Sequence, residues 1–209
     1  SEGTLALITE ATLRTDPLPA SSAVALLFFD RLENAAQGAL VATEQGVSAC
    51  DLLDRRLLTL AREDHVQFEL LIPAAAEAML FVEFQGEDCK QELEALVARL
   101  LRRKKLAFAA RVAVEADEIE LYWQLTRRVV PRLYRLKGST RPVPFIEDVA
   151  VAPERLPEFL VDVPNVFKNH EVTTSLFGHV GHGQLHLRPF LDIANENDIG
   201  KMQRLATDL

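Results

Sequence analysis

The sequence has little cysteine, no long apolar run and no excess of basic residues. Only two cysteines, Cys50 and Cys89, occur in 209 residues. Their spacing fits neither a metal site nor a redox motif, so we expect reduced thiols. No apolar run approaches the roughly 20 residues of a membrane span, and no signal peptide is visible. The net charge of -8 argues against nucleic acid as the main partner, because phosphate binding needs a basic surface.

The one basic run, Arg102-Arg103-Lys104-Lys105, closes a segment with helical periodicity. There it suits the negative end of the helix dipole, so we interpret it as a solvated helix end, with a binding patch as the alternative. A hydrophobic content of 48% and a charged content of 26% are ordinary for a soluble globular protein. A chain of this length makes one large domain or two small ones.

Strand-like and helix-like segments alternate along the chain. The pattern predicts strands at 23–29, 47–53, 78–85, 106–114, 144–151 and 172–180. It predicts helices at 31–45, from 88, from 117, from 153 and at 194–209, with short helical or irregular pieces at 55–62 and 74–77. Up to residue 115 the order is β-α-β followed by β-α-β, the split arrangement of a ferredoxin-like sandwich. We therefore expect an α+β protein with a mainly antiparallel sheet.

Glycine and proline mark expected helix boundaries. Gly46 is expected to stop the helix that precedes it. Pro131 and Pro164 lie inside helical patterns, and we expect each to kink or end its helix. Pro153 lies at the start of a helical segment, a position that proline favours.

The stretch from Phe177 to Pro189, Phe-Gly-His-Val-Gly-His-Gly-Gln-Leu-His-Leu-Arg-Pro, gathers three of the five histidines and three of the nine glycines. We predict a strand, a glycine turn and a second strand. On one unbroken strand His179 and His186 would face opposite ways, because their separation is odd and side chains alternate. A turn or bulge at Gly181 or Gly183 removes that obstacle, since glycine accepts positive φ. Both imidazoles can then point to one place.

Residues 4–13 mix β-branched and apolar residues, and Asp16-Pro17-Leu18-Pro19 follows them as a stop and a linker. This pattern suits the last strand of one unit better than the first strand of another. The chain has no initiator Met, begins abruptly at Ser1-Glu2-Gly3, and its final helix has no stop signal. We therefore expect a piece cut from a longer protein.

Three blocks, in this order, resemble one family. Residues 1–13 are similar to the end of the flavin-binding domain of FAD-linked oxidases of the vanillyl-alcohol-oxidase type. Pro144 to Val151 resembles a block in that family's C-terminal domain. Phe177 to Pro189 is similar to its Gly-His-x-Gly-Asp-Gly-Asn-x-His signature. The likeness spans nearly the whole chain and is to members of the D-lactate, glycolate and D-2-hydroxyglutarate dehydrogenase type. The Pro-Phe-Ile-Glu-Asp and His-Leu-Arg-Pro segments are most similar to the large members that also carry iron-sulfur motifs, although no such cysteine motif is present in this sequence.

The resemblance implies a cap of two ferredoxin-like halves, about 20–115 and 116–209, truncated at its C-terminus. Residues 1–19 would be the last strand of the FAD-binding domain and a linker, with Glu2 and Gly3 as cofactor-binding residues. The implied reaction is oxidation of a D-2-hydroxy acid by hydride transfer to FAD, which the absent domain mainly holds. We expect this piece to be inactive by itself and cytoplasmic, or peripheral to a membrane as a respiratory-chain donor. Its exposed docking face would favour a homodimer or aggregation.

His179 and His186 match the family's two metal-ligand histidines, which implies a divalent ion such as zinc with a third ligand beyond Leu209. Such an ion binds the substrate hydroxyl and carboxylate and eases proton loss as hydride leaves. Alternatively a histidine acts as the base directly, or both histidines merely brace a tight turn. His182 and Gln184 replace the Asp and Asn of the signature. His182 is then either an extra base or ligand, or a solvent-facing turn residue.

The resemblance also points to substrate-binding residues. Arg188 and Gln184 lie where related enzymes place polar contacts, and a guanidinium suits a bidentate grip on a carboxylate. The alternative for Arg188 is a salt bridge with Asp192 or another acid. A substrate-binding arginine of the family corresponds to Thr126 here, and Arg127 follows it, so Arg127 is a further candidate.

Glu147 and Asp148 are adjacent acids in a predicted strand. Neighbouring strand residues face opposite sides, which argues against a carboxylate pair that shares a proton. We expect one of the two to face the site and the other to form structural hydrogen bonds.

Two other hypotheses compete with the dehydrogenase. One is a stand-alone ferredoxin-like module that binds a small acid or a metal without catalysis. The other is a purely structural cap whose histidines have lost their function. The metal content and the flavin of the intact protein would separate these possibilities.

Overall fold

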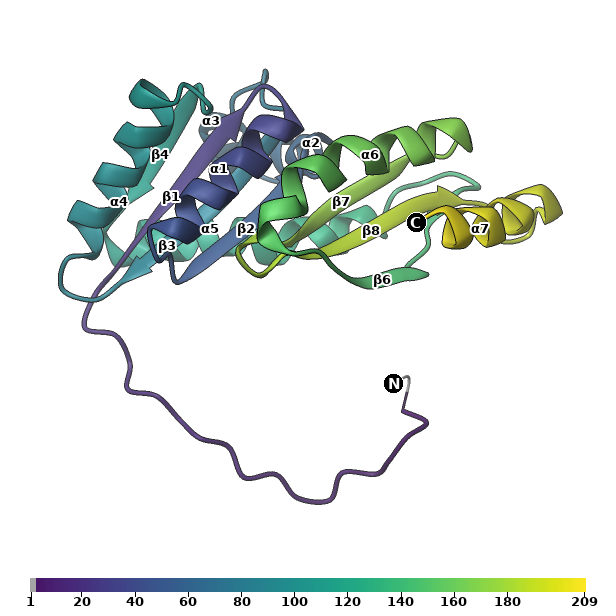
Figure 1. Cartoon of the computed structure of the whole chain (residues 1–209), viewed down its shortest axis with the longest axis horizontal. Helices are drawn as coiled ribbons and strands as arrows, with labels where there is room; N and C mark the ends of the chain where they lie inside the picture. Colours follow the sequence, from purple (N-terminus) through teal and green to yellow (C-terminus); the bar gives the residue numbers. More distant parts are fainter. Residues whose placement is uncertain (1–2) are drawn as a thin grey trace.

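The computed structural model describes the backbone of residues 3–209 and, within that range, every side chain except that of Asp148 (Figure 1). In this part of the chain one antiparallel sheet contains eight strands, in the order β4-β1-β3-β2-β7-β8-β5, with β6 also paired to β8. The strands are β1 (Ser22–Phe29), β2 (Ala49–Asp54), β3 (Ala78–Gln85), β4 (Ala109–Ala113), β5 (Arg141–Pro142), β6 (Ile146–Ala150), β7 (Thr174–His179) and β8 (Gln184–Leu191). The predicted α+β class with an antiparallel sheet is confirmed.

Helices cover both faces of the sheet. They are α1 (Leu32–Glu44), α2 (Arg55–Asp64), α3 (Val66–Leu71), α4 (Cys89–Ala98), α5 (Ala116–Leu133), α6 (Leu156–Asn169) and α7 (Glu196–Asp208). The side chains of α1, α4, α6 and α7 pack into one core and those of α2, α3 and α5 into the other. None of these helices is both long and apolar enough to cross a membrane.

The central strands are apolar on both sides because each side meets a helix layer. In β1, residues Ala23 to Phe29 are all fully buried, with alternate side chains entering the two cores. Strand β3 is buried in the same way up to Phe84. Helix α4 contributes Leu93, Leu96 and, in the π-helical turn Arg99–Arg103 that extends it, Leu100. Cys50 and Cys89 are free thiols buried in this core.

Both halves of the chain use a related strand order. The first half runs β-α-β-β-α-β, as predicted, with α2 and α3 inserted before β3. The second runs β6-α6-β7-β8-α7, and the described residues contain no counterpart of β4. The two halves meet where β2 pairs with β7. From β2 the sheet continues to β3 and then β1, and from β7 it continues to β8 and then β6. In each half the second strand of the unit is thus at the junction, the third lies next to it and the first follows. The halves share one sheet, so the division near residue 115 stays a prediction.

The prolines shape the helices less than expected. Helix α5 continues past Pro131 to Leu133, and α6 continues past Pro164 to Asn169. Of the two alternatives at Pro164, an end is excluded and a kink stays a prediction. A proline removes its own hydrogen bond and crowds the preceding turn, but buried Val163 and Phe167 on either side of it hold α6 against the sheet. The predicted stop at Gly46, which follows α1 at φ 82°, is confirmed.

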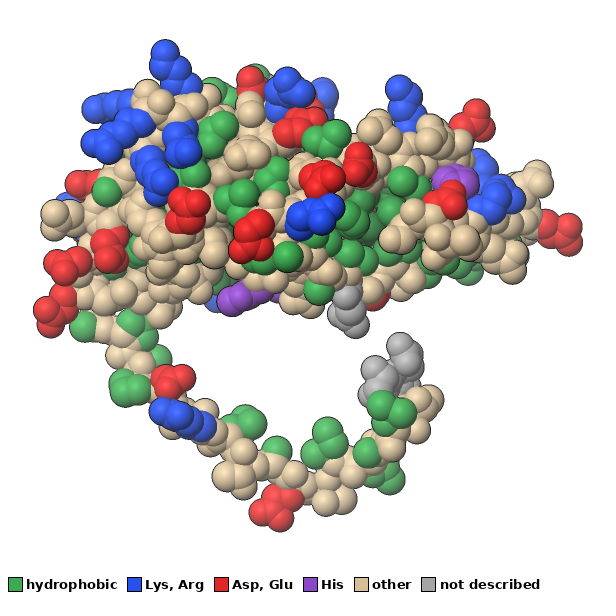
Figure 2. All heavy atoms as spheres, viewed as in Figure 1, with side chains coloured by type: hydrophobic (Ala, Val, Ile, Leu, Met, Phe, Trp, Pro, Cys, Tyr) green, Lys and Arg blue, Asp and Glu red, His purple; other side chains and the backbone are tan. Residues whose placement is uncertain are grey.

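Two surface segments complete the fold. Residues 4–19 are exposed and form no strand within the described chain, and Figure 1 shows them running away from the body of the molecule. A strand here would need partners from another domain, so that expectation stays a prediction. Lysine and arginine side chains gather over α4 in Figure 2. The residues from Arg102 to Lys105 are exposed at the end of the π-helical turn, which agrees with a solvated helix end.

The junction between the halves is short. Strand β2 meets β7 through two residue pairs, Leu52 with Gly178 and Leu53 with Phe177. The carboxylate of Asp54 reinforces them, because it accepts hydrogen bonds from Leu176 N at 2.7 Å and the Ser175 hydroxyl at 3.0 Å, both of β7. The same carboxylate caps α2 by accepting from Leu57 N at 3.0 Å. Desolvation raises the pKa of this carboxyl, and the hydrogen bonds oppose that rise. We call β2, β7 and Asp54 the seam.

The turn between β7 and β8 requires glycine. A short 3-10 turn, Val180–His182, ends at Gly183, which has a φ of 72°. A Cβ atom on Gly183 would lie 1.8 Å from the carbonyl oxygen of Val151, and one on Gly178 would lie 2.2 Å from that of Gln184. Positive φ and close backbone approach therefore both exclude side chains from this hairpin.

Replacing Asp54 with alanine should destabilise the protein strongly. It leaves two backbone N–H groups and a hydroxyl without their acceptor, so we expect the free energy of unfolding to fall by about 2–5 kcal/mol. Urea unfolding followed by circular dichroism measures this. Asp162→Ala, an exposed position on α6, should change stability by less than about 0.5 kcal/mol. Equal effects of the two substitutions would show that the seam does not depend on Asp54.

Gly183→Ala and Gly46→Ala separate backbone strain from a steric clash. Both glycines have positive φ, at 72° and 82°, but nothing lies within 4 Å of a Cβ on Gly46. We expect Gly46→Ala to cost about 1 kcal/mol and Gly183→Ala about 3 kcal/mol or more, because only the second also forces the backbone apart. The same unfolding assay applies, and a matching loss at both sites would contradict the packing described for the hairpin.

Candidate functional site

Polar side chains converge on the face of the sheet that α5 covers, where β7 and β8 form their hairpin. His179 pairs with Gln184, and His186 pairs with Phe177, so the two histidines are diagonal neighbours on one face. Their ring centroids lie 6.2 Å apart, with the ring planes at 87°. The sequence predicted that a glycine turn would bring both imidazoles to one place, and the hairpin does so.

Each histidine is held through its Nδ1 atom by a carboxylate from another strand. His179 Nδ1 lies 2.7 Å from Asp51 Oδ1 of β2, and His186 Nδ1 lies 2.9 Å from Glu147 Oε2 of β6. A hydrogen on Nδ1 donates to the acid and leaves Nε2 with its lone pair. Two imidazole Nε2 atoms are thus available, as bases or as metal ligands, on the same surface.

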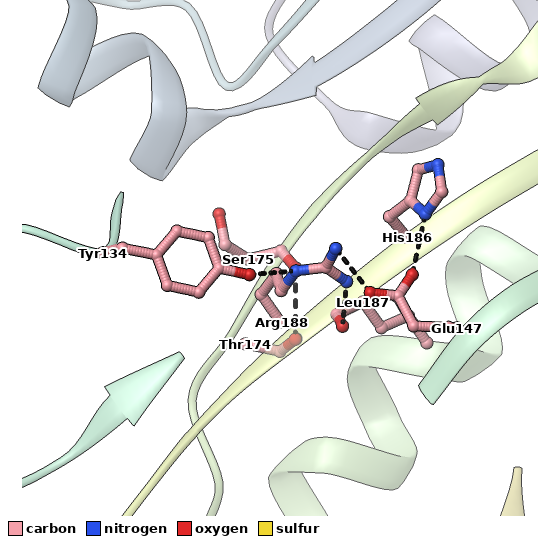
Figure 3. A network of polar contacts seen from close by, with 7 residues as sticks. All are labelled: Tyr134, Glu147, Thr174, Ser175, His186, Leu187 and Arg188. Carbon is pink, nitrogen blue, oxygen red and sulfur yellow. Dashed lines mark hydrogen bonds and ion pairs between the residues drawn. The ribbon is translucent and has the colours of Figure 1, made fainter. Parts of the chain in front are cut away.

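Glu147 also fixes Arg188 (Figure 3). Its second oxygen lies 2.5 Å from Arg188 Nη2, while Arg188 Nε donates to the Tyr134 hydroxyl at 2.8 Å and Nη1 donates to the carbonyl of Leu187 at 3.1 Å. Only 10% of the Arg188 side chain is exposed. Arg188 is therefore held in an ion pair, and its partner is Glu147 rather than Asp192. Glu147 is the member of the acidic pair that faces the site, as expected of one of the two.

Phe177 orders the same surface. Its ring stacks on that of His186, with centroids 5.0 Å apart and 29° between the planes. The guanidinium of Arg188 lies 5.2 Å from the Phe177 centroid. Hydrogen bonds at the ring edge and stacking on its face together restrict the orientation of His186.

A pocket of about 260 Å³ opens beside His179, between β2, β7 and α5. The indole of Trp123 lines it and packs on Phe81, with centroids 4.3 Å apart. Arg127 also lines it, 5.6 Å from the Trp123 ring and 3.2 Å from Glu120, with 61% of its side chain exposed. Arg127 thus lies in the same pocket as His179, whereas Arg188 does not line it.

Sequence reasoning missed two acids on this face. Asp51 is far from His179 in the chain, and only the pairing of β2 with β7 brings them together. Glu83 is almost fully buried on β3. Desolvation raises the pKa of Glu83, and hydrogen bonds with Gln85 and the Trp123 indole oppose that rise. A buried Glu at an inward position of a strand was the local signal that could have identified it.

The other residues predicted for the site lie at the edge of this surface or away from it. His182 is exposed in the turn, which agrees with the solvent-facing alternative. Gln184 is partly buried at the start of β8, opposite His179. Gly3 is exposed with a φ of 75°, and Glu2 lies outside the described residues.

A larger hollow of about 800 Å³ lies beside Asp54 and the start of α2, and none of the hairpin histidines lines it. Two of its three arginines are paired, Arg31 with Glu33 at 3.3 Å and Arg55 with Glu77 at 2.8 Å. The guanidinium of the third, Arg56, lies 4.6 Å from the Phe190 ring centroid. No histidine is among its described lining residues, so the imidazole pair belongs to the hairpin.

Within the described residues no group of three His, Cys, Asp or Glu side chains is arranged to hold a metal ion. The hairpin offers two imidazole donors, and the carboxylates behind them are the usual outer partners of metal-ligand histidines. The donor set therefore fits part of a site for a divalent ion such as zinc, which needs further ligands.

Comparison with solved structures supports the fold. p-Cresol methylhydroxylase matches 92% of this chain with a TM-score of 0.62 at 9% sequence identity, over 43% of its own length. The 4-ethylphenol oxidase from Gulosibacter chungangensis matches 92% of the chain with a TM-score of 0.60, also at 9% identity, over 44% of its own length.

Curated relatives are similar over the whole chain. A D-2-hydroxyglutarate dehydrogenase of Pantoea ananatis is 32% identical, and one of Escherichia coli is 31% identical. The glycolate oxidase subunit GlcD of Bacillus subtilis is 25% identical. The chain spans 22% of the length of the first two and 43% of the third. Residues 18–209 match the model of the C-terminal domain of FAD linked oxidases, and the chain belongs to this family.

Proposed function

We propose that this chain forms the substrate side of the active site in a longer FAD-dependent oxidoreductase that oxidises a D-2-hydroxy acid. Family membership and the names of the similar proteins support this reaction class. The observation that carries the proposal is the hairpin, where two imidazoles converge and each has a carboxylate at Nδ1.

Oxidation of a 2-hydroxy acid removes a hydride from C2 and a proton from the hydroxyl, and a carbonyl forms. FAD, held mainly by another domain, supplies the two-electron acceptor when bound. His186 Nε2 takes the hydroxyl proton, and Glu147 at Nδ1 stabilises the imidazolium that results. Phe177 keeps the ring in place during the transfer.

His179 offers a second Nε2 atom on the same surface. Asp51 orients its ring through Nδ1, as Glu147 orients that of His186. The two Nε2 atoms also suit a divalent ion, zinc among others, with its third ligand from outside the described residues. Such an ion would lower the pKa of the substrate hydroxyl.

Arg127 binds the carboxylate of the substrate. It is the guanidinium that shares a pocket with His179, and it is accessible, whereas Arg188 is buried against Glu147. An exposed ion pair such as Arg127–Glu120 is weak, so a carboxylate ligand displaces Glu120 at little cost. Gln184, opposite His179, adds a polar contact, and Arg188 positions Glu147.

His186→Ala tests the catalytic role in the full-length protein. Flavin reduction is followed by loss of visible absorbance with D-lactate, glycolate, D-2-hydroxyglutarate and longer D-2-hydroxy acids. We expect the substitution to slow reduction by about 100-fold or more, because it removes the base. His182→Ala, in the turn that precedes β8 and exposed, should stay within a few-fold of the natural protein. A colourless parent, or equal rates without His186, would favour a binding module without catalysis.

Metal analysis of the same proteins tests the ligand role. If His179 and His186 hold an ion, we expect close to one divalent ion per chain in the natural protein and almost none in His179→Ala or His186→Ala. His182→Ala should retain it. Active protein free of metal would eliminate the metal role and leave His186 as the base.

A further inference from the structure

The pocket beside His179 has apolar walls. Its sides come from β2, β7 and α5, and the side chains that form them are Leu53, Trp123, Val130 and Phe177. Two of the four are aromatic, and both are held rigidly: Trp123 by Phe81 and Phe177 by His186. Rigid aromatic walls bind a flat or branched hydrocarbon group without a large loss of side-chain entropy.

Thr126, Asp51 and Arg127, polar residues of this pocket, already have hydrogen-bond or ion-pair partners. Thr126 donates its hydroxyl to the carbonyl of Trp123 at 3.0 Å, which leaves its methyl group for a ligand. Asp51 is bonded to His179. Among the described lining residues Arg127 is the one lysine or arginine, and Glu120 lies 3.2 Å from it.

Among the described lining residues this inventory leaves no lysine or arginine for a second carboxylate. His179, with any ion that it holds, acts at the hydroxyl end of the substrate. A 2-hydroxy dicarboxylate brings two negative charges, one beside its hydroxyl and one at the far end. Arg127 can balance one of them, Arg188 is committed to Glu147, and Asp51 would repel the other. Burying an unpaired carboxylate against Leu53 and Val130 would be costly, whereas a hydrocarbon group gains by leaving water.

Resting on the proposed function, we infer that the substrate is a 2-hydroxy acid with a branched aliphatic or aromatic side chain, which lies between Trp123 and Phe177. Thr126 and Trp123 set this preference. The dicarboxylate named in the D-2-hydroxyglutarate dehydrogenases that the chain resembles is then a poor substrate.

The first test uses the natural full-length enzyme. We expect kcat/KM for D-2-hydroxy-4-methylpentanoate or D-3-phenyllactate to exceed that for D-lactate and for D-2-hydroxyglutarate by about 10-fold or more, the discrimination that an apolar pocket provides. A higher kcat/KM for D-lactate or D-2-hydroxyglutarate would overturn the inference and leave the proposed function intact. If no hydroxy acid reduces the flavin, the proposed function itself fails.

Thr126→Arg supplies the missing cation. We expect it to raise the ratio of kcat/KM for D-2-hydroxyglutarate to that for D-2-hydroxy-4-methylpentanoate by about 10-fold or more. Thr207→Arg is the matched control, because Thr207 also donates to the backbone of its helix, at 3.0 Å, but lies exposed on α7. It should leave the ratio unchanged. An unchanged ratio in a folded, flavin-containing Thr126→Arg enzyme would contradict the placement of the side chain in this pocket.

Arg127→Gln identifies which carboxylate this arginine binds. If Arg127 holds the carboxylate common to every substrate, kcat/KM falls by a similar factor for all four acids. If it binds a far carboxylate, only the value for D-2-hydroxyglutarate falls, and the inference is wrong.

Discussion

The site depends on the pairing of β2 with β7. That pairing is only two residues long, and the carboxylate of Asp54 reinforces it with hydrogen bonds from two residues of β7, Ser175 and Leu176. Because Leu52 is opposite Gly178, Asp51 comes to lie beside His179, three residues along the same strand from Asp54. One strand thus both joins the halves and supplies an acid to the site.

Strand alternation lets β7 and β8 serve two purposes. Leu176, Leu185 and Leu187 point into one core, while Phe177 and His186 point to the other face. The arrangement needs close contact between backbones, which is why Gly178 and Gly183 have no room for side chains. Packing of the leucines on one face of the sheet therefore fixes the positions of His179 and His186 on the other face. Both histidines belong to strands of the hairpin and not to a loop.

Local pattern predicted most of the fold, and the convergence of His179 with His186, since strand period and glycine conformation are properties of neighbouring residues. That one acid of the pair Glu147 and Asp148 would face the site was expected for the same reason. Asp51, Tyr134 and the pocket wall at Trp123 were not, because they reach the site through pairings between distant segments. Helix α6 continues past Pro164 because tertiary packing, which local pattern does not contain, outweighs the disruption by proline.

The two imidazole–carboxylate contacts differ in where their members originate. His186 and Glu147 both belong to the second half, whereas His179 takes its acid from the first. A small rotation of one half against the other would stretch the contact between His179 and Asp51 and leave that between His186 and Glu147 unaltered. The placement of the His179 ring therefore depends on how β2 lies against β7, whereas the contact of His186 with Glu147 lies within the second half alone.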